Sequence, residues 1–373
     1  MIYFDPDKTK AAIVTCGGLS PGINDVIRAI VMGLHYRYGV RDIIGIRYGF
    51  QGFIPEYGRT NIVLNPELVK DIHALGGSIL SSSRGPQDIG KIVDYLSGRK
   101  INMLFCIGGD GTMRATDRIT DEINRRKLNI SVIGIPKTID NDLNLIDKSF
   151  GFNTAISEVV KVIQCAHVEA KGAPLGIGLV KIMGRESGHI AANATLAQND
   201  VNFTLIPENS FDIEGEDGFL RVLERRLMER GHSVILVAEG AGQDLFAGDV
   251  TQKTDASGNV KLHDIGIYLK SRIEEYFKKR DIDISLKYID PSYIIRSVPA
   301  NAGDSLYCEL LGQYAAHAAM SGRTGMVVGL FKNEYVHLPL SVTSSRRKVD
   351  VKGNVWMRVI ESTGQPLSMK NEK

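Results

Sequence analysis

Short apolar runs alternate with segments of helical periodicity along most of the chain. The apolar runs predict strands at Ala11–Cys16, Asp42–Ile46, Ile101–Ile107, Ile130–Ile135, Gly176–Ile182, Asn202–Ile206 and Ser233–Ala238. Helical spacing predicts helices between them, among others at Met113–Ile123, Phe150–Ala170, Gly218–Arg230 and Ile265–Lys279. This alternation is typical of parallel sheets with helices on both faces, which bind ligands at the carboxyl ends of their strands.

The length of the chain, 373 residues, favours two domains over one. The expected fold class is therefore α/β, with two Rossmann-like lobes whose mostly parallel sheets are covered by helices. A net charge of +2 argues against nucleic-acid binding driven by bulk charge, and we expect no membrane partner because no apolar run has the length of a membrane span. The four cysteines have no CxxC spacing and the N-terminus resembles no signal peptide, so we expect a cytoplasmic location.

Two glycine-rich turns follow predicted strands. Gly17-Gly18 precedes a helix, which suits phosphate binding by backbone amides but equally suits a plain turn. Gly108-Gly109-Asp110-Gly111-Thr112 is the stronger signal, because Asp110 at a strand end can hold Mg²⁺ beside phosphates. The alternative is that Asp110 or Thr112 only caps the following helix, which leaves the three glycines unexplained.

The segment Ile133–Asp142 ends in Thr138-Ile139-Asp140-Asn141-Asp142. If it is extended, Thr138, Asp140 and Asp142 project to one side. Asp140 then suits a general base that takes a proton from a hydroxyl, and Asp142 suits its electrostatic neighbour. The alternative is an Asx turn, since Asp-Asn-Asp is common in turns. Together with the glycine motif, this segment suggests phosphoryl transfer to an alcohol.

Further candidates lie at other predicted strand ends. Arg185, in Met183-Gly184-Arg185, suits charge stabilisation on a moving phosphoryl group, or else a surface ion pair with Glu186. Glu239 suits the binding of sugar hydroxyls, or else is an ordinary charged residue of a loop. A phosphate-binding cluster is one interpretation of Arg84, Lys287, Tyr293 and Arg296, the last three along a segment predicted to be extended. The alternative is that they are separate solvated cations and a tyrosine at the edge of the core.

In this order the motifs resemble the 6-phosphofructokinase family over Ala11 to about Leu340, in particular the ATP-dependent branch of plants and trypanosomes. The resemblance implies that Asp140 is the catalytic base, and together with the roles inferred above we predict a catalytic group of Asp140, Asp142, Arg185 and Thr138. It implies nucleotide binding by Gly17, Arg84, Gly85, Gly109, Asp110, Gly111 and Thr112, with Asp110 as the Mg²⁺ ligand. It implies fructose 6-phosphate binding by Thr138, Asp140, Met183, Gly184, Arg185, Glu239, Lys287, Tyr293 and Arg296.

The resemblance also implies a division of the chain. We expect a nucleotide-binding lobe of residues 1–150 plus about 297–340, a fructose 6-phosphate-binding lobe of 151–296, and a C-terminal extension of 341–373. The expected partners are ATP and fructose 6-phosphate, and the expected assembly is a homodimer or homotetramer. One departure affects that assembly: the bacterial pattern has an arginine that reaches the neighbouring subunit's sugar phosphate, where this chain has Gly176.

The phosphoryl donor depends on two positions. Pyrophosphate-using relatives usually carry aspartate where this chain has Gly111, and that carboxylate would repel the α-phosphate of ATP. Lys137 instead resembles the pyrophosphate-using enzymes. We give Gly111 more weight and predict an ATP-dependent 6-phosphofructokinase, with a pyrophosphate-dependent enzyme as the alternative. A nicotinamide-nucleotide or lipid kinase fits the 138–142 and 183–185 motifs poorly, and a catalytically silent sugar-phosphate sensor would be expected to lack Asp110, Asp140 or Arg185.

Overall fold

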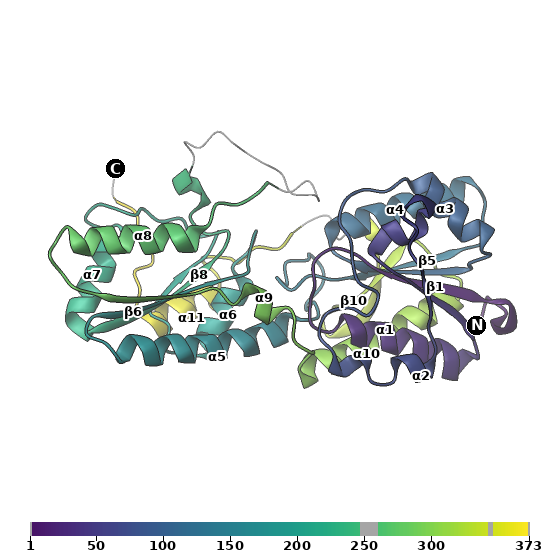
Figure 1. Ribbon diagram of the computed structural model, residues 1–373, viewed down its shortest axis with the longest axis horizontal. Helices are drawn as coiled ribbons and strands as arrows, with labels where there is room; N and C mark the ends of the chain where they lie inside the picture. The colour runs from purple at the N-terminus through teal and green to yellow at the C-terminus, as the bar shows by residue number, and fades with distance from the viewer. Residues whose placement is uncertain (1, 247–259, 342–345, 372–373) are drawn as a thin grey trace. The chain divides into compact units, whose positions relative to one another are not determined.

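The computed structural model describes residues 2–246, 260–341 and 346–371 (Figure 1). The chain divides into two compact units, each with its own sheet. Of the described residues, unit 1 contains 2–154, 296–341 and 346, and unit 2 contains 155–246, 260–295 and 347–371. Residues 342–345 and 372–373 of the expected C-terminal extension lie outside the described residues, and 347–371 are part of unit 2.

Unit 1 is built on a seven-stranded sheet with the order β11-β10-β5-β4-β1-β2-β3. Its strands are β1 (Lys10–Thr15), β2 (Asp42–Ile46), β3 (Ile62–Val63), β4 (Met103–Gly108), β5 (Ser131–Pro136), β10 (Met326–Phe331) and β11 (Glu334–Pro339). Its helices are α1 (Ile23–Met32), α2 (Pro66–Val69), α3 (Ile89–Gly98), α4 (Asp110–Arg125) and α10 (Ala302–Met320). The central strands are parallel, and only the β2–β3 and β10–β11 pairs are antiparallel among the described strands of this sheet.

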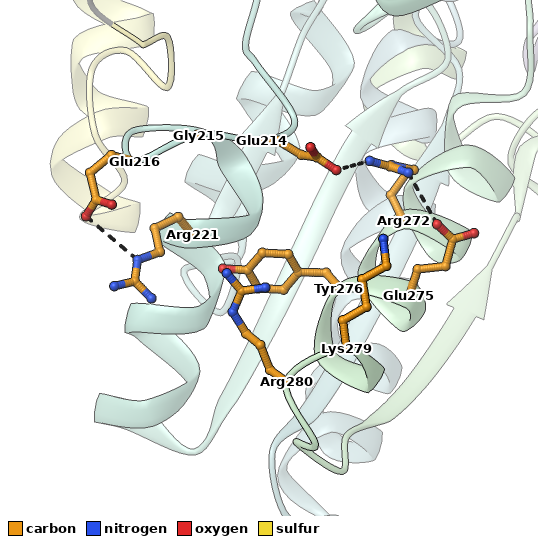
Figure 2. Close-up of a pocket in the computed structure, with 9 residues that line it drawn as sticks. All are labelled: Glu214, Gly215, Glu216, Arg221, Arg272, Glu275, Tyr276, Lys279 and Arg280. Carbon is orange, nitrogen blue, oxygen red and sulfur yellow. Dashed lines mark hydrogen bonds and ion pairs between the residues drawn. The ribbon is translucent and has the colours of Figure 1, made fainter.

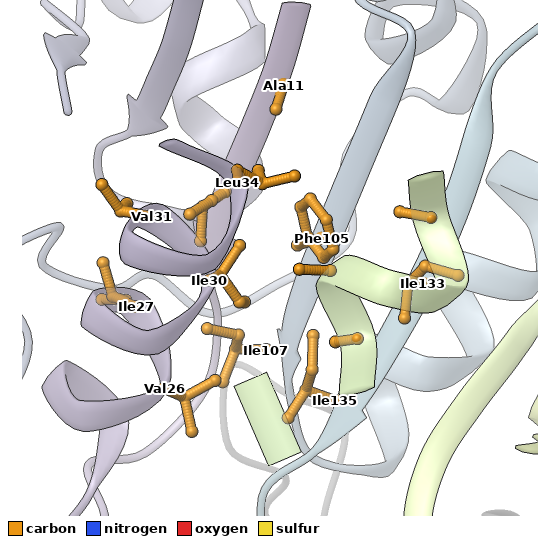
Figure 3. Close-up of a cluster of buried hydrophobic side chains, with 14 of the residues drawn as sticks. Ala11, Val26, Ile27, Ile30, Val31, Leu34, Phe105, Ile107, Ile133 and Ile135 are labelled. Atoms are coloured by element: carbon orange, nitrogen blue, oxygen red, sulfur yellow. The ribbon is translucent and has the colours of Figure 1, made fainter. Parts of the chain in front are cut away.

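Successive residues of the central strands of unit 1 supply two different cores. Phe105 and Ile107 of β4 pack toward α1 and α10, in the cluster that Figure 3 shows. Leu104 and Cys106 pack toward α3 and α4 on the opposite face. Both faces are apolar because a parallel strand in the middle of such a sheet is buried on each side.

The helices α1 and α10 pack closely because a glycine lies where they meet. A Cβ atom at Gly312 would lie 2.5 Å from the Cβ atom of Ala29, so a larger residue there would push the helices apart.

Unit 2 has a four-stranded, fully parallel sheet with the order β7-β8-β6-β9. Its strands are β6 (Gly176–Ile182), β7 (Phe203–Leu205), β8 (His232–Ala238) and β9 (Ser285–Ile289). Its helices are α5 (Phe152–Lys171), which begins in unit 1, and α6 (His189–Ala197), α7 (Phe219–Arg230), α8 (Ile265–Lys278), α9 (Ser292–Ile295) and α11 (Asn354–Thr363). Helices α7 and α8 cover one face of the sheet, and α5, α6 and α11 lie on the other (Figure 1).

Several predicted features differ from the structure. The segment 138–142 is bent, not extended, because Asn141 has a left-handed φ of 53°. The segment 286–295 is extended only to Ile289, and Ser292–Ile295 forms the short helix α9. The weakly patterned C-terminal segment contains α11, whose Trp356 is fully buried.

No helix in the described ranges is long and apolar enough to cross a membrane.

Candidate active site

The turn after β1 in unit 1 is tied to the segment that carries Arg84. The Gly17 N–H donates to the Ser83 carbonyl oxygen at 3.3 Å, and the Ser82 hydroxyl donates to the Gly17 carbonyl oxygen at 2.7 Å. Gly17 has a φ of +84°, a conformation that glycine adopts without strain. These bonds hold Arg84 at the carboxyl end of β1, where the sequence predicted a phosphate-binding residue.

Two arginines and a buried lysine gather next to this turn. A Cβ atom at Gly18 would lie 3.8 Å from Nη2 of Arg84 and 3.9 Å from Nη1 of Arg296. Lys137 is only 7% exposed, and burial lowers its pKa to about 8. The charges of Arg84 and Arg296 also lower that pKa, whereas the Asp140 carboxylate opposes them. Unit 1 therefore presents a concentrated positive charge beside the predicted general base.

The glycine motif after β4 forms the start of α4. Gly109 is the N-cap residue, and the N–H groups of Thr112 and Met113 donate to its carbonyl oxygen. Within the described part of the chain no side-chain hydrogen bond caps the helix, so the capping role considered for Asp110 and Thr112 is not observed. A Cβ atom at Gly111 would meet only Nη2 of Arg114 at 3.9 Å, which leaves open space at the first turn of the helix.

Asp110 does not stand alone, since Arg346 joins it to Asp142. Nε and Nη2 of Arg346 donate to Oδ2 of Asp110 at 2.9 and 2.6 Å. Nη1 of Arg346 lies 3.4 Å from Oδ2 of Asp142. No sequence pattern predicted Arg346 as a site residue, because it lies far along the chain in a polar stretch with no motif around it.

The Thr138–Asp142 segment forms a hydrogen-bonded turn that gathers its polar groups. The Thr138 hydroxyl donates to Oδ1 of Asp142 at 3.0 Å and accepts the Asp140 N–H at 3.2 Å. Burial raises the pKa of the Asp142 carboxyl, and the Asp110 charge adds to this, while Arg346 and Thr138 oppose it. The three polar residues do lie together, but through a turn and not through strand alternation.

In unit 2, the loops after β6 and β8 touch. The Glu239 N–H donates to the Ile182 carbonyl oxygen at 2.9 Å, and the Gly240 N–H donates to that of Gly184 at 3.1 Å. Any Cβ atom at Gly240 would lie 1.9 Å from the Arg185 carbonyl oxygen, so only glycine fits there. This contact brings the predicted sugar-binding residues Arg185 and Glu239 to neighbouring loops at the carboxyl end of the sheet.

The Arg185 side chain has partners within unit 2. Its Nη2 donates to the Val260 carbonyl oxygen, and its Nε lies 3.7 Å from Oε1 of Glu186. The structure therefore contains the Arg185–Glu186 ion pair that the sequence offered as the alternative role of Arg185. The side chain remains 25% exposed, and such a long, partly exposed ion pair contributes little stability.

The structure does not bring the remaining predicted cluster together within one unit. Lys287 is exposed and pairs with Gly178 in the middle of β6, not at its carboxyl end. Tyr293 lies in α9 with 74% of its surface exposed. Arg296 belongs to unit 1, next to Arg84.

Gly176, where the bacterial pattern has an arginine, begins β6. A Cβ atom there would lie 2.0 Å from the Ala170 carbonyl oxygen at the end of α5. A side chain at this position, arginine included, would therefore require the backbone at the end of α5 to shift.

A charged cavity of about 580 Å³ lies elsewhere in unit 2 (Figure 2). Its charges are largely paired with one another: Arg272 with Glu214 and Glu275, and Arg221 with Glu216. Arg280 stacks on the Tyr276 ring at 3.7 Å. None of the predicted site residues lines it, and we assign no function to it.

Comparisons with known proteins agree with the α/β fold class. The phosphofructokinase family model matches residues 10–319. An ATP-dependent 6-phosphofructokinase of Borreliella burgdorferi is 55% identical over 99% of this chain and 84% of its own length. ATP-dependent 6-phosphofructokinase 7 of Arabidopsis thaliana is 50% identical over 98% of this chain and 75% of its own.

Among solved structures, a pyrophosphate-dependent phosphofructokinase from Marinobacter aquaeolei matches with a TM-score of 0.77. The match covers 98% of this chain and 92% of the other chain. Because the sequences are only 18% identical, it supports the fold alone. The fold and the site together define a kinase-like α/β protein of two lobes. The chain belongs to the phosphofructokinase family, which confirms the family and the fold class that the sequence motifs predicted.

Proposed function

We propose that the protein is an ATP-dependent 6-phosphofructokinase, which transfers the γ-phosphoryl group of ATP to the 1-hydroxyl of fructose 6-phosphate. The observation that carries this proposal is the turn in which Thr138 gathers Asp140 and Asp142 beside the buried cation Lys137. A carboxylate next to clustered positive charge suits proton removal from an alcohol while phosphate charge is stabilised. The relatives with this activity span nearly the whole chain.

Unit 1 supplies the proposed donor site. The first turn of α4, at Gly109–Gly111, presents backbone N–H groups to phosphate oxygens. Gly17 lies in the turn after β1, and Arg84 and Gly85 follow the Ser82–Ser83 segment that is hydrogen-bonded to it. Asp110 and Asp142 offer the carboxylate oxygens that Mg²⁺ prefers, so these residues fit the metal. Mg²⁺ held there would neutralise phosphate charge. No group of three or more metal-ligating side chains occurs in the described parts, which suits a metal bound largely by phosphates and water.

Unit 2 supplies most of the proposed sugar-phosphate site. Met183, Gly184 and Arg185 follow β6, and Glu239 follows β8 in the loop that touches them. The proposed set of fructose 6-phosphate ligands also includes Thr138, Asp140 and Arg296 of unit 1, and Lys287 and Tyr293 of unit 2. Because Lys287 is exposed in mid-strand, we propose that it acts only in a homodimer or homotetramer.

We also propose a cytoplasmic location. All four cysteines are free thiols, as in proteins of reducing compartments.

The deciding experiment is turnover of fructose 6-phosphate with ATP and with pyrophosphate, side by side, in the presence of Mg²⁺. We expect fructose 1,6-bisphosphate to form with ATP and much more slowly with pyrophosphate. The open space at Gly111 favours ATP, whereas Lys137 favours the pyrophosphate-dependent alternative. Faster turnover with pyrophosphate would establish that alternative, and no turnover with either donor would favour a silent sensor.

A further inference from the structure

Arg346 holds two carboxylates whose proposed task is to bind a cation. Its guanidinium donates twice to Oδ2 of Asp110 and lies 3.4 Å from Oδ2 of Asp142. The Asp142 side chain is only 5% exposed and that of Asp110 15%, so their charges are poorly solvated. A positive group between them therefore compensates a repulsion that water would otherwise screen weakly.

The backbone of Arg346 is anchored independently of these charges. Arg346 forms an antiparallel bridge with Leu143, the residue after Asp142. The arginine is thus delivered to this place by main-chain pairing, and its side chain still has 33% exposure toward solvent. A guanidinium with that exposure can leave the carboxylates while its backbone stays in position.

We propose that Arg346 takes the place of the divalent cation between Asp110 and Asp142 in the metal-free enzyme, and that metal binding displaces its guanidinium. This inference rests on the proposed metal role of Asp110. A Mg²⁺ ion needs carboxylate oxygens at about 2.1 Å, and Oδ2 of Asp110 already accepts two N–H groups. Arginine and metal cannot both use that oxygen, so they compete.

The competition sets the apparent affinity for the metal. Each metal ion must break charge-assisted hydrogen bonds that Arg346 makes in the free enzyme. Removing Arg346 leaves the two carboxylates without their counterion and ready for another cation. While the Arg346 guanidinium is paired with the two carboxylates, it also excludes cations that bind the site weakly.

The test is binding of Mn²⁺, a paramagnetic stand-in for Mg²⁺, to the nucleotide-free enzyme by electron paramagnetic resonance. We expect Arg346→Ala to bind Mn²⁺ roughly tenfold tighter than the wild type, since partly exposed charge-assisted bonds are removed. Arg346→Lys should lie between the two, because lysine keeps the charge without the fork. The matched control is Arg125→Ala, which breaks an ion pair with Glu122 at the other end of α4 and should leave Mn²⁺ affinity unchanged.

Asp110→Asn, made in both the wild-type and the Arg346→Ala protein, separates this inference from the proposed function. If Asp110→Asn weakens Mn²⁺ binding but Arg346→Ala does not tighten it, the competition is overturned and the metal role stands. If Asp110→Asn changes nothing in either protein, the metal role itself fails. Weaker binding by Arg346→Ala, with an unchanged unfolding temperature, would make Arg346 a supporting residue of the cation site and overturn the proposal.

Discussion

At the scale of single residues, the chemistry of the site depends on small turns that place a few polar atoms. Thr138 accepts the Asp140 backbone N–H and donates to Oδ1 of Asp142, so one hydroxyl fixes the Asp140 backbone and orients the Asp142 carboxylate. The sequence identified these residues because they follow a strand and a glycine motif. It could not identify Arg346, since only the folded chain brings that arginine to Asp110.

Asp140→Asn should nearly abolish turnover while fructose 6-phosphate binding survives. Loss of a general base typically lowers the rate on the order of a hundred- to ten-thousand-fold, whereas the amide keeps the size of the side chain. Steady-state kinetics and calorimetric binding measure the two effects. Asp121→Asn, at an exposed position of α4, is the control and should behave as wild type. A variant that keeps a near-normal kcat would remove Asp140 from the base role.

Gly111→Asp should lower the preference for ATP over pyrophosphate. The position has space for a side chain, so a carboxylate would face the donor without disrupting α4. Two unit charges at about 4 Å repel by about 4 kcal/mol at an effective dielectric constant of 20, before shielding by metal. Gly111→Asn has the same shape without the charge and should change the kcat/KM ratio of the two donors much less. Equal effects of the two substitutions would rule out repulsion as the discriminator.

Lys137 predicts a pH dependence in the alkaline range. Because its pKa is lowered to about 8, the free enzyme loses this positive charge as the pH rises through that value. We expect kcat/KM for ATP to fall above pH 8, since this parameter reports ionisations of the free enzyme. Lys137→Arg keeps its charge and should remove the fall. If the arginine variant shows the same fall in kcat/KM above pH 8, the fall is caused by the ionisation of another group.

At the scale of elements, the apolar pattern predicted most strands of the two sheets, but not β10, which pairs with β5 in unit 1. The predicted Gly176–Ile182 strand is β6, and the predicted Gly218–Arg230 helix is α7 with one residue fewer. Turns and short helices were harder to predict from the sequence, because a single residue with left-handed backbone angles, such as Asn141, redirects the chain without changing the polarity pattern. The helix α11 had a signal in the helical spacing of Trp356, Val359 and Thr363, which are its buried residues.

The packing of α5 on β6 predicts the effect of any side chain at Gly176. Gly176→Ala should destabilise the protein by about 1–3 kcal/mol, because the new Cβ atom would overlap the Ala170 carbonyl oxygen unless the backbone shifts. Urea unfolding measures the loss as a lower midpoint. The control is Gly98→Ala in α3, where no atom lies within 4 Å of the new methyl group. Equal midpoints for both variants would mean that β6 tolerates the bulk an arginine needs.

At the scale of the whole molecule, the predicted site residues divide between two units that are each compact. The proposed donor residues, including Asp110 and Arg84, all lie in unit 1. The proposed sugar-phosphate residues lie in both, with Arg185 and Glu239 in unit 2 and Thr138 in unit 1. Sequence motifs predict the chemical role of a residue, but they give no distances between units. Which unit binds which ligand is therefore best tested by the protection from hydrogen exchange that each ligand causes.

Hydrogen exchange should respond differently to the two ligands. A non-hydrolysable ATP analogue with Mg²⁺ should protect the backbone around Gly109–Thr112 in unit 1 and leave the Met183–Arg185 loop of unit 2 unchanged. Fructose 6-phosphate should protect both that loop and the Thr138–Asp142 turn, because bound ligand suppresses local opening at each of its contacts. Inorganic phosphate at the same concentration is the control for anion binding alone. If the sugar phosphate protects only unit 1, Arg185 and Glu239 are not its ligands, and the proposed role of unit 2 is wrong.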